Sequence, residues 1–437
     1  MKYKWFPVLP FMLYWIISFI LYDFGPFVNT ELDLNTYLYL GLCFLLFAAF
    51  YRNGLKSSHW NSSTTCESDV TVTFNILRWS SFLTLIGTIL LLVDRIQSGS
   101  GSLDLVLNRL EDVREYYVNK TTILTAIAVV PQSFRLVAFS SYFYCLKNKI
   151  LVPKKIHLCM FATISCELYN MILAANRGIL FWLTTYWLFY LFFCKQVSVK
   201  ELLLSKGYFK LRCAFLAIIL ISLSYFYFVA KNRDDSSYLT QLGTQVSSYS
   251  RYSLDYSFFD DKSLGAAYQL FTYGTHEFEY INTFVKNAEI INFDFITPLG
   301  PRIEYQITKI FPSYVSSSKE TGQQWMKNDG LSIFGWASTF GWSLAFFGFL
   351  GSFMFFGTLG FMSGSFVRLY LNSQEFGWFL LVFVMYASLN MSFDWVLKDI
   401  EQFVAVIMAI VLIKNARLKR VTLTNASNCY YEGIGID

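Results

Sequence analysis

Residues 170–187 read NMILAANRGILFWLTTYW, and Asn176-Arg177-Gly178 separates two stretches that are otherwise apolar. The surrounding segment, residues 156–194, contains two formally charged side chains, Glu167 and Arg177. A helix needs about 20 apolar residues to cross a bilayer, so this segment is long enough for two crossings and too long for one. Asn-Arg-Gly is the plausible turn between them. The segment therefore predicts a helical hairpin in a membrane, with Arg177 at one surface.

The composition extends this prediction to the whole chain. Hydrophobic residues make up 55% of the 437 residues and charged residues 15%, whereas a soluble domain carries about 25% charged residues. We therefore expect an all-α polytopic membrane protein with about ten transmembrane helices. The candidate spans are 5–22, 35–51, 75–93, 122–145, 156–174, 178–194, 211–230, 342–366, 376–393 and 398–413.

The distribution of Lys and Arg predicts the orientation of these spans. Basic residues gather in alternate loops, beginning with Lys2 and Lys4 and ending with the tail from Lys414 to Arg420. Short basic loops stay in the cytoplasm, so both termini are expected there. The chain then divides into helices one to seven with an outer loop near 94–121 (1–230), one large late outer loop (231–341), the last three helices (342–413) and a cytoplasmic tail (414–437).

Several classes of site are not indicated by the sequence. The eight cysteines all fall in predicted spans or on the predicted inner side, so no disulfide framework is expected. No Cys/His spacing suggests zinc, and no glycine motif suggests a bound nucleotide. We therefore expect no metal, no cofactor and no nucleic-acid partner, and the lipid bilayer as the surrounding medium.

Arg177 is a candidate anion ligand. If a helix begins at the turn, Asn176 can cap it, and the helix N-terminus adds partial positive charge. Unpaired amide groups together with a guanidinium suit a phosphate. An Arg that extends to the membrane interface, or one that pairs with Glu167, is the simpler alternative.

Two further charges lie inside predicted spans. Arg135 follows the kink-prone Pro131, and Glu167 lies in the next span. Ionisable groups at that depth are usually paired or functional. A structural ion pair between Arg135 and Glu167 and a role in lining a cavity are both open.

The large outer loop contains the chemically capable residues. Residues 264–288 have apolar residues at helical spacing, with Leu264, Tyr268 and Phe271 on one face, which predicts a surface helix. His276 and Glu279 share a helix face, so His276 is a candidate general base, with Glu277 as a weaker one. A solvated surface histidine is the simpler alternative. The same loop supplies Arg233, Arg251 and Arg302 as further anion ligands.

The layout resembles the O-antigen polymerases (Wzy-type), a family of oligosaccharide repeat unit polymerases within a larger group that includes the O-antigen ligases. The resemblance rests on ANRGILFW (175–182) at the outer surface, on the large late loop, and on the glycine-aromatic stretch 334–361 that enters a late span. It implies an enzyme of lipopolysaccharide biosynthesis in the bacterial inner membrane, with the outer loop in the periplasm.

The reaction that this resemblance implies joins two undecaprenyl-diphosphate-linked glycans. An acceptor hydroxyl attacks the anomeric carbon of the donor, and the lipid diphosphate leaves. Arg177, Arg233, Arg251 and Arg302 would bind the diphosphate, and His276 or Glu277 would accept the proton. A chain-length regulator and a flippase are possible partners. The alternatives are an O-antigen ligase and a lipid-linked glycan flippase, the latter favoured by Arg135 and Glu167.

Overall fold

The computed structural model describes residues 5–26, 31–56, 70–97, 123–173, 260–273, 275–292, 317–331, 338–371 and 377–393, with residue 294 and parts of 206–227 and 402–412. Within these residues the regular structure is helical and contains no strand. The predicted all-helical class is therefore confirmed for the described part of the chain.

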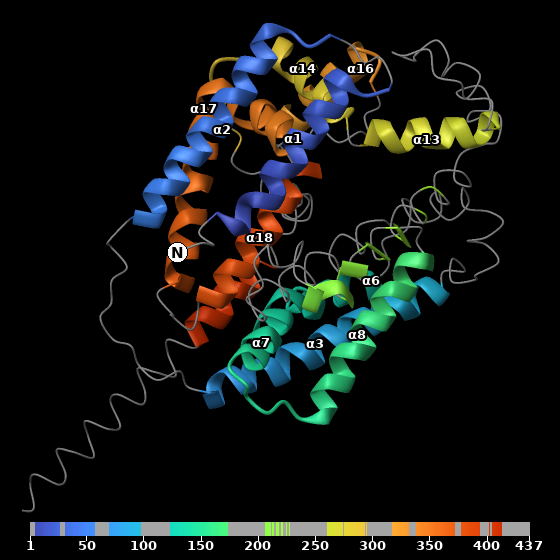
Figure 1. The fold of residues 1–437 in the computed structure, drawn as a ribbon, viewed down its shortest axis with the longest axis vertical. Coiled ribbons are helices and arrows are strands. Elements are labelled where there is room, and N and C mark those ends of the chain that lie inside the picture. Colours follow the sequence, from blue (N-terminus) through green and yellow to red (C-terminus); the bar gives the residue numbers. More distant parts are fainter. Residues whose placement is uncertain are drawn as a thin grey trace, which may run out of the picture.

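The helices form two groups (Figure 1). The first group consists of η1 (Phe6–Val8), α1 (Leu9–Phe24), α2 (Leu34–Lys56), α14 (Glu277–Asn287), α16 (Ser317–Asn328), α17 (Ser338–Leu371) and α18 (Gly377–Phe393). The second consists of α3 (Val70–Gln97), α6 (Ile123–Gln132), α7 (Arg135–Lys147) and α8 (Lys154–Leu173). Helix α7 contacts α18 and so joins the two groups. α13 (Asp261–Tyr273) approaches the end of α1, where Phe271 faces Gly25.

Five predicted spans coincide with helices, and two, 122–145 and 342–366, differ from the structure. Spans 5–22, 35–51, 75–93, 156–174 and 376–393 correspond to α1, α2, α3, α8 and α18. Span 122–145 is two helices, α6 and α7, because Pro131 lacks an amide donor and its ring disfavours a continuous helix. There the Ser133 hydroxyl donates to the Val130 carbonyl oxygen at 2.6 Å. Span 178–194 lies outside the described residues, and 211–230 and 398–413 are described only in part.

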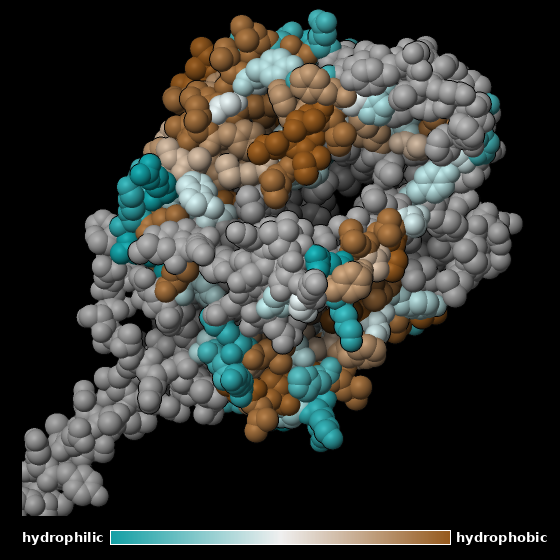
Figure 2. All heavy atoms as spheres, viewed as in Figure 1, coloured by the Kyte–Doolittle hydropathy of each residue, from teal (hydrophilic) through white to brown (hydrophobic). Residues whose placement is uncertain are grey.

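The exposed and buried faces of these helices are those of a membrane protein. α2, α17 and the Phe74–Gln97 part of α3 are each long and apolar enough to cross a membrane. On α2, Leu38 and Leu45 are more than half exposed, whereas Thr36 is fully buried. Apolar side chains cover much of the visible surface of the first group (Figure 2). Apolar residues outside and small polar residues inside indicate association with lipid.

Glycines allow the backbones of α2 and α17 to approach closely. A Cβ atom added at Gly360 would lie 2.4 Å from the Phe47 carbonyl oxygen, and one at Gly364 would lie 2.1 Å from that of Tyr51. In a membrane, small residues at an interface let helix backbones come together. The glycine-aromatic stretch of the sequence thus serves this helix pair.

Helix α17 is broken at Gly348, where φ is +66° and ψ is −171°. Residues 338–347 fold back on the second part of α17, so that the rings of Phe340 and Phe356 stack with centroids 4.5 Å apart. The continuous helix begins after Gly348, later than the predicted start of the span at 342. The loop segment 289–294 bonds the backbone groups freed by the break: Asn292 and Asp294 donate to the carbonyls of Phe347 and Phe346, and Phe349 donates to that of Glu289.

Gly348→Ala is expected to lower the free energy of unfolding by about 1–3 kcal/mol, because a left-handed φ strains any side chain there. The added Cβ atom would also lie 2.7 Å from the Glu289 carbonyl oxygen. The thermal midpoint of the detergent-solubilised protein measures the loss. Gly330→Ala is the control, since Gly330 has φ +72° but no atom within 4 Å of an added Cβ. Equal losses in both variants would mean that the contact with segment 289–294 contributes nothing.

The predicted helix over 264–288 is two helices, α13 and α14. Leu264, Tyr268 and Phe271 pack together on α13, which confirms that they share one face. α14, however, is not a surface helix, because Phe278, Ile281 and most of its other residues are buried. The difference arises because α14 packs against α2, α16 and α17, contacts that the local spacing of residues does not encode.

Candidate functional site

Helix α14 is held against α1 at its start and against α2 farther along. Near its start, the ring of Phe278 packs against those of Trp15, Phe19 and Tyr22 on α1, with centroids 5.1 to 5.9 Å apart. In the middle of α14, the Asn282 Oδ1 atom accepts a hydrogen bond from the Thr36 hydroxyl of α2 at 2.6 Å. These contacts fix a helix of the large loop between the end of α1 and the start of α2.

Two more contacts hold the C-terminal half of α14. The Lys286 ammonium lies 3.4 Å from the Asp33 carboxylate, with both side chains about half exposed. The Thr283 hydroxyl donates to Asp329 at 2.5 Å. Because the exposed ion pair contributes little, the buried aromatic and amide contacts set the position of the helix.

His276 occupies the residue before the first turn of α14. Its Nδ1 atom is in hydrogen-bond contact with the Thr272 carbonyl oxygen, and its ring meets that of Tyr280 edge-on at 5.4 Å. A carbonyl oxygen only accepts, so Nδ1 carries the proton and the basic lone pair lies on Nε2. Burial lowers the pKa of His276 below its ordinary value of 6.5. The imidazole is therefore neutral at pH 7 and able to accept a proton.

Glu277 lies directly after His276 but is fully buried, with 0% exposure. Its Oε1 atom accepts a hydrogen bond from the Tyr14 hydroxyl on α1 at 2.8 Å. Its Oε2 atom has no hydrogen-bond partner among the described residues. Burial raises the pKa of Glu277 from 4.5 to about 8. The carboxyl group is thus buried and neutral at pH 7, a form that cannot accept a proton, so the structure gives no support to Glu277 as the general base.

The sequence did not identify Tyr14 as the partner of Glu277. Tyr14 lies in an apolar stretch rich in aromatic residues, and its partner is 263 residues away. A tyrosine in such a stretch is usually a core or membrane-interface residue. No local pattern could have distinguished Tyr14 from its aromatic neighbours.

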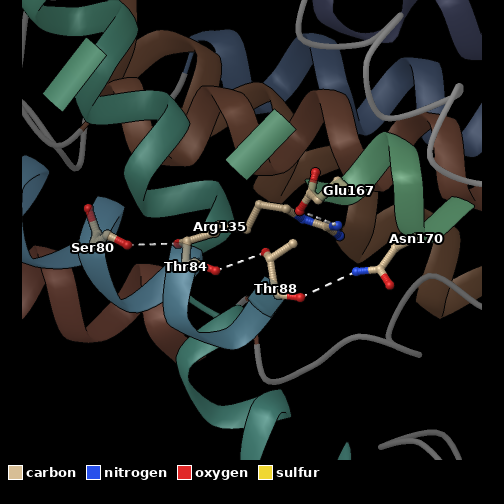
Figure 3. A network of polar contacts seen from close by, with 6 residues as sticks. All are labelled: Ser80, Thr84, Thr88, Arg135, Glu167 and Asn170. Carbon is tan, nitrogen blue, oxygen red and sulfur yellow. Dashed lines mark hydrogen bonds and ion pairs between the residues drawn. The ribbon is translucent and has the colours of Figure 1, made fainter. Parts of the chain in front are cut away.

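Arg135 and Glu167 are joined in the second helix group (Figure 3). The Arg135 Nη1 atom lies 3.3 Å from Glu167 Oε1, and the two side chains are 8% and 2% exposed. The pair connects α7 to α8. Whether it has a role beyond this contact stays a prediction.

A band of small polar residues on α3 faces this ion pair (Figure 3). The Thr84 hydroxyl donates to the Ser80 carbonyl at 2.7 Å, and that of Thr88 donates to the Thr84 carbonyl at 2.9 Å. The Thr88 carbonyl accepts from the Asn170 amide of α8 at 3.3 Å. The Thr84 and Thr88 hydroxyls bond carbonyls of their own helix, so this face of α3 is polar while these two donors are paired.

The described residues contain two separate clusters of candidate residues. His276, Glu277 and Tyr14 lie in the first helix group, and Arg135 and Glu167 in the second. Arg177, Arg233, Arg251 and Arg302 lie outside the described residues. Among described residues, no group of three His, Cys, Asp or Glu side chains could hold a metal ion.

The chain was compared with known proteins in three ways. No family model, no curated protein and no solved structure matches it. A functional proposal for this chain therefore depends on its own residues and on the resemblance in layout described above.

Proposed function

We propose that the protein is a glycosyltransferase that joins undecaprenyl-diphosphate-linked oligosaccharide repeat units at the periplasmic face of the bacterial inner membrane. The observation that carries the proposal is the position of His276: a neutral histidine at the start of a loop helix that packs among α1, α2 and α17. A base placed beside membrane helices suits a substrate tethered to lipid.

In the proposed ten-span topology this histidine lies below the outer surface of the membrane, within the helix bundle. With the cytoplasmic N-terminus, α1 runs outward and ends at Phe24. Tyr14, ten residues earlier, then lies about 15 Å below that outer end at 1.5 Å per residue. Because Glu277 bonds Tyr14, the start of α14 reaches into the bundle from the periplasmic side. Polar backbone is tolerated at this depth when protein surrounds it.

In the proposed reaction, His276 Nε2 accepts the proton of the acceptor hydroxyl as its oxygen attacks the anomeric carbon of the donor. The bond between that carbon and the diphosphate oxygen breaks, and the diphosphate leaves with the bonding electrons. Arg177, Arg233, Arg251 and Arg302 are proposed to stabilise its negative charge. Two lipid-tethered substrates held side by side gain further rate from their fixed orientation.

A lipid-linked glycan flippase is the second candidate. The buried Arg135–Glu167 pair supports it, because charges at membrane depth often line a transport path. An O-antigen ligase would use the same donor and the same site, with lipid A-core as acceptor. The banding pattern of lipopolysaccharide distinguishes the three activities.

His276→Ala is expected to lower polymerisation at least about 100-fold, since a general base contributes at least that much. The test is a lipopolysaccharide gel of a deletion strain that carries the wild-type, His276→Ala or Arg177→Ala gene. We expect the deletion to leave core with a single repeat unit, the wild type to restore the ladder, and both variants to fail to restore it.

The matched control is His157→Ala, since the His157 ring contacts Tyr142 far from α14. This variant should restore the ladder, and membrane immunoblots should show equal amounts of every protein. If the deletion strain lost every O-antigen band, the proposed function would be that of a ligase or flippase and not of a polymerase. An unchanged ladder in the deletion strain would show that the protein does not polymerise O-antigen.

A further inference from the structure

We propose that Tyr14 is a positioning residue: its hydroxyl and the protonated carboxyl of Glu277 form an anchor that holds the start of α14, and with it His276, against α1. The part that concerns His276 rests on the proposed function. The anchor itself does not, because it is a contact between two described helices.

The geometry of Glu277 favours its neutral form. The carboxyl group is fully buried, and the next residue, Phe278, packs its ring against Trp15 and Tyr22 on α1. One oxygen accepts from Tyr14 at 2.8 Å, and the other has no hydrogen-bond partner in the described part of the chain. An ionised carboxylate would need more donors than this site supplies.

No described cation compensates a charge on Glu277. On α14 itself the titratable neighbours are His276, which is neutral at pH 7, and the acidic Glu279. The first part of α17, residues 338–347, contains no charged residue. Toward the C-terminal half of α14 and on α16, the charged groups are Asp33 with Lys286, Asp329, Glu320 and Lys327. On α1 the charged group is the acidic Asp23, which accepts from Tyr37. The cations of α2 and α17 (Arg52, Lys56 and Arg368) lie near the C-terminal ends of these helices, whereas α14 bonds Thr36 at the start of α2.

The sign of the pH effect follows from these contacts. In the unfolded chain Glu277 titrates near 4.5, and burial raises its pKa to about 8 in the folded protein. The native state therefore keeps a proton that the unfolded state has lost between these values. The stability that Glu277 supplies is complete below pH 4.5 and is lost as the pH rises through 8. Above pH 8 a buried carboxylate favours release of α14 from α1.

The first experiment measures thermal unfolding of the purified full-length protein from pH 5 to pH 9, without any activity assay. Relative to Glu277→Gln, the unfolding constant of the wild type should rise about tenfold per pH unit up to pH 8 and then level off. Glu279→Gln is the matched control, the same change two residues away, and should keep the wild-type slope. Identical pH dependence in wild type and Glu277→Gln would overturn the anchor.

The second experiment measures the pH profile of polymerisation. Wild-type activity should fall above pH 8, and Glu277→Gln should lose this alkaline decline. Tyr14→Phe removes the hydrogen bond that holds the start of α14, so its activity should fall at every pH. The same hydrogen bond lowers the pKa of Glu277, so the alkaline decline of the remaining activity should move to higher pH. If the contact between Tyr14 and Glu277 were only structural, neither variant would change the pH dependence of activity. If Glu277→Gln does not fold, the pH profile of Tyr14→Phe tests the anchor in its place.

The two experiments separate the anchor from the proposed function. If the stability slope is present but no variant polymerises glycans at any pH, the proposed function fails and the anchor stands. If the slope is present and the alkaline decline survives in Glu277→Gln, the anchor does not position His276, and that part of the proposal is overturned.

Discussion

Replacing Arg135 by leucine is expected to lower the free energy of unfolding by about 3–5 kcal/mol, the cost of leaving a buried partner charge uncompensated. Arg135 contacts Glu167 at 3.3 Å, and neither side chain is more than 8% exposed. Glu167→Leu should cost a similar amount for the same reason. Thermal or denaturant unfolding of the detergent-solubilised variants measures both losses.

The double variant Arg135→Leu/Glu167→Leu is the decisive control for this pair. Removing both charges removes the desolvation penalty as well, so its stability should return to within about 1–2 kcal/mol of wild type. A double variant as unstable as either single variant would show that the two charges do not act as a pair. This double-mutant cycle isolates their interaction from their separate contacts.

The same double variant distinguishes a structural pair from a transport path. If the variant is stable and the lipopolysaccharide ladder is intact, the pair serves only to join α7 and α8. If the variant is stable but lipid-linked repeat units accumulate inside the cell, the charges line a path for the substrate and the flippase gains support. Either conclusion requires that the wild type and the double variant are present in the membrane in equal amounts.

The contact between Arg135 and Glu167 could be anticipated because charged residues are rare in apolar stretches. Few ionisable groups lie at that depth, so each has few possible partners. Tyr14 and Glu277 offer the opposite case: a tyrosine among many aromatic residues, and a glutamate in a polar loop. Their contact depends on how a loop helix folds back onto α1, and no spacing in the sequence records it.

Five of the predicted spans coincide with described helices, but only one of the two breaks within predicted spans could be foreseen. Pro131 marks one break by its chemistry, since it lacks an amide donor. The break at Gly348 carries no such mark, because the stretch around it contains several other glycines. Only the contact with segment 289–294 selects Gly348, where φ is positive and a side chain would meet the Glu289 carbonyl oxygen.

Gly364→Ala is expected to separate α2 from α17 and to lower the free energy of unfolding by about 1–3 kcal/mol or more. The added Cβ atom would lie 2.1 Å from the Tyr51 carbonyl oxygen and 2.9 Å from its carbon. These are backbone atoms of a helix, so relief requires the whole helix to move rather than one side chain. Gly360→Ala meets the Phe47 carbonyl oxygen at 2.4 Å and should show the same loss.

Gly41→Ala on α2 is the matched control, because no atom lies within 4 Å of its added Cβ. Removing a glycine from the interior of a helix should stabilise the protein by about 0.5–1 kcal/mol, since alanine loses less conformational freedom on folding. The thermal midpoint should therefore fall for Gly364→Ala and rise for Gly41→Ala. A fall of equal size in both would attribute the effect to contact with the surrounding lipid or detergent rather than to the approach of the two helices. A methyl group where the two backbones meet would then cost no more than one on the exposed side of α2, and the close approach of α2 and α17 would not be what requires Gly364.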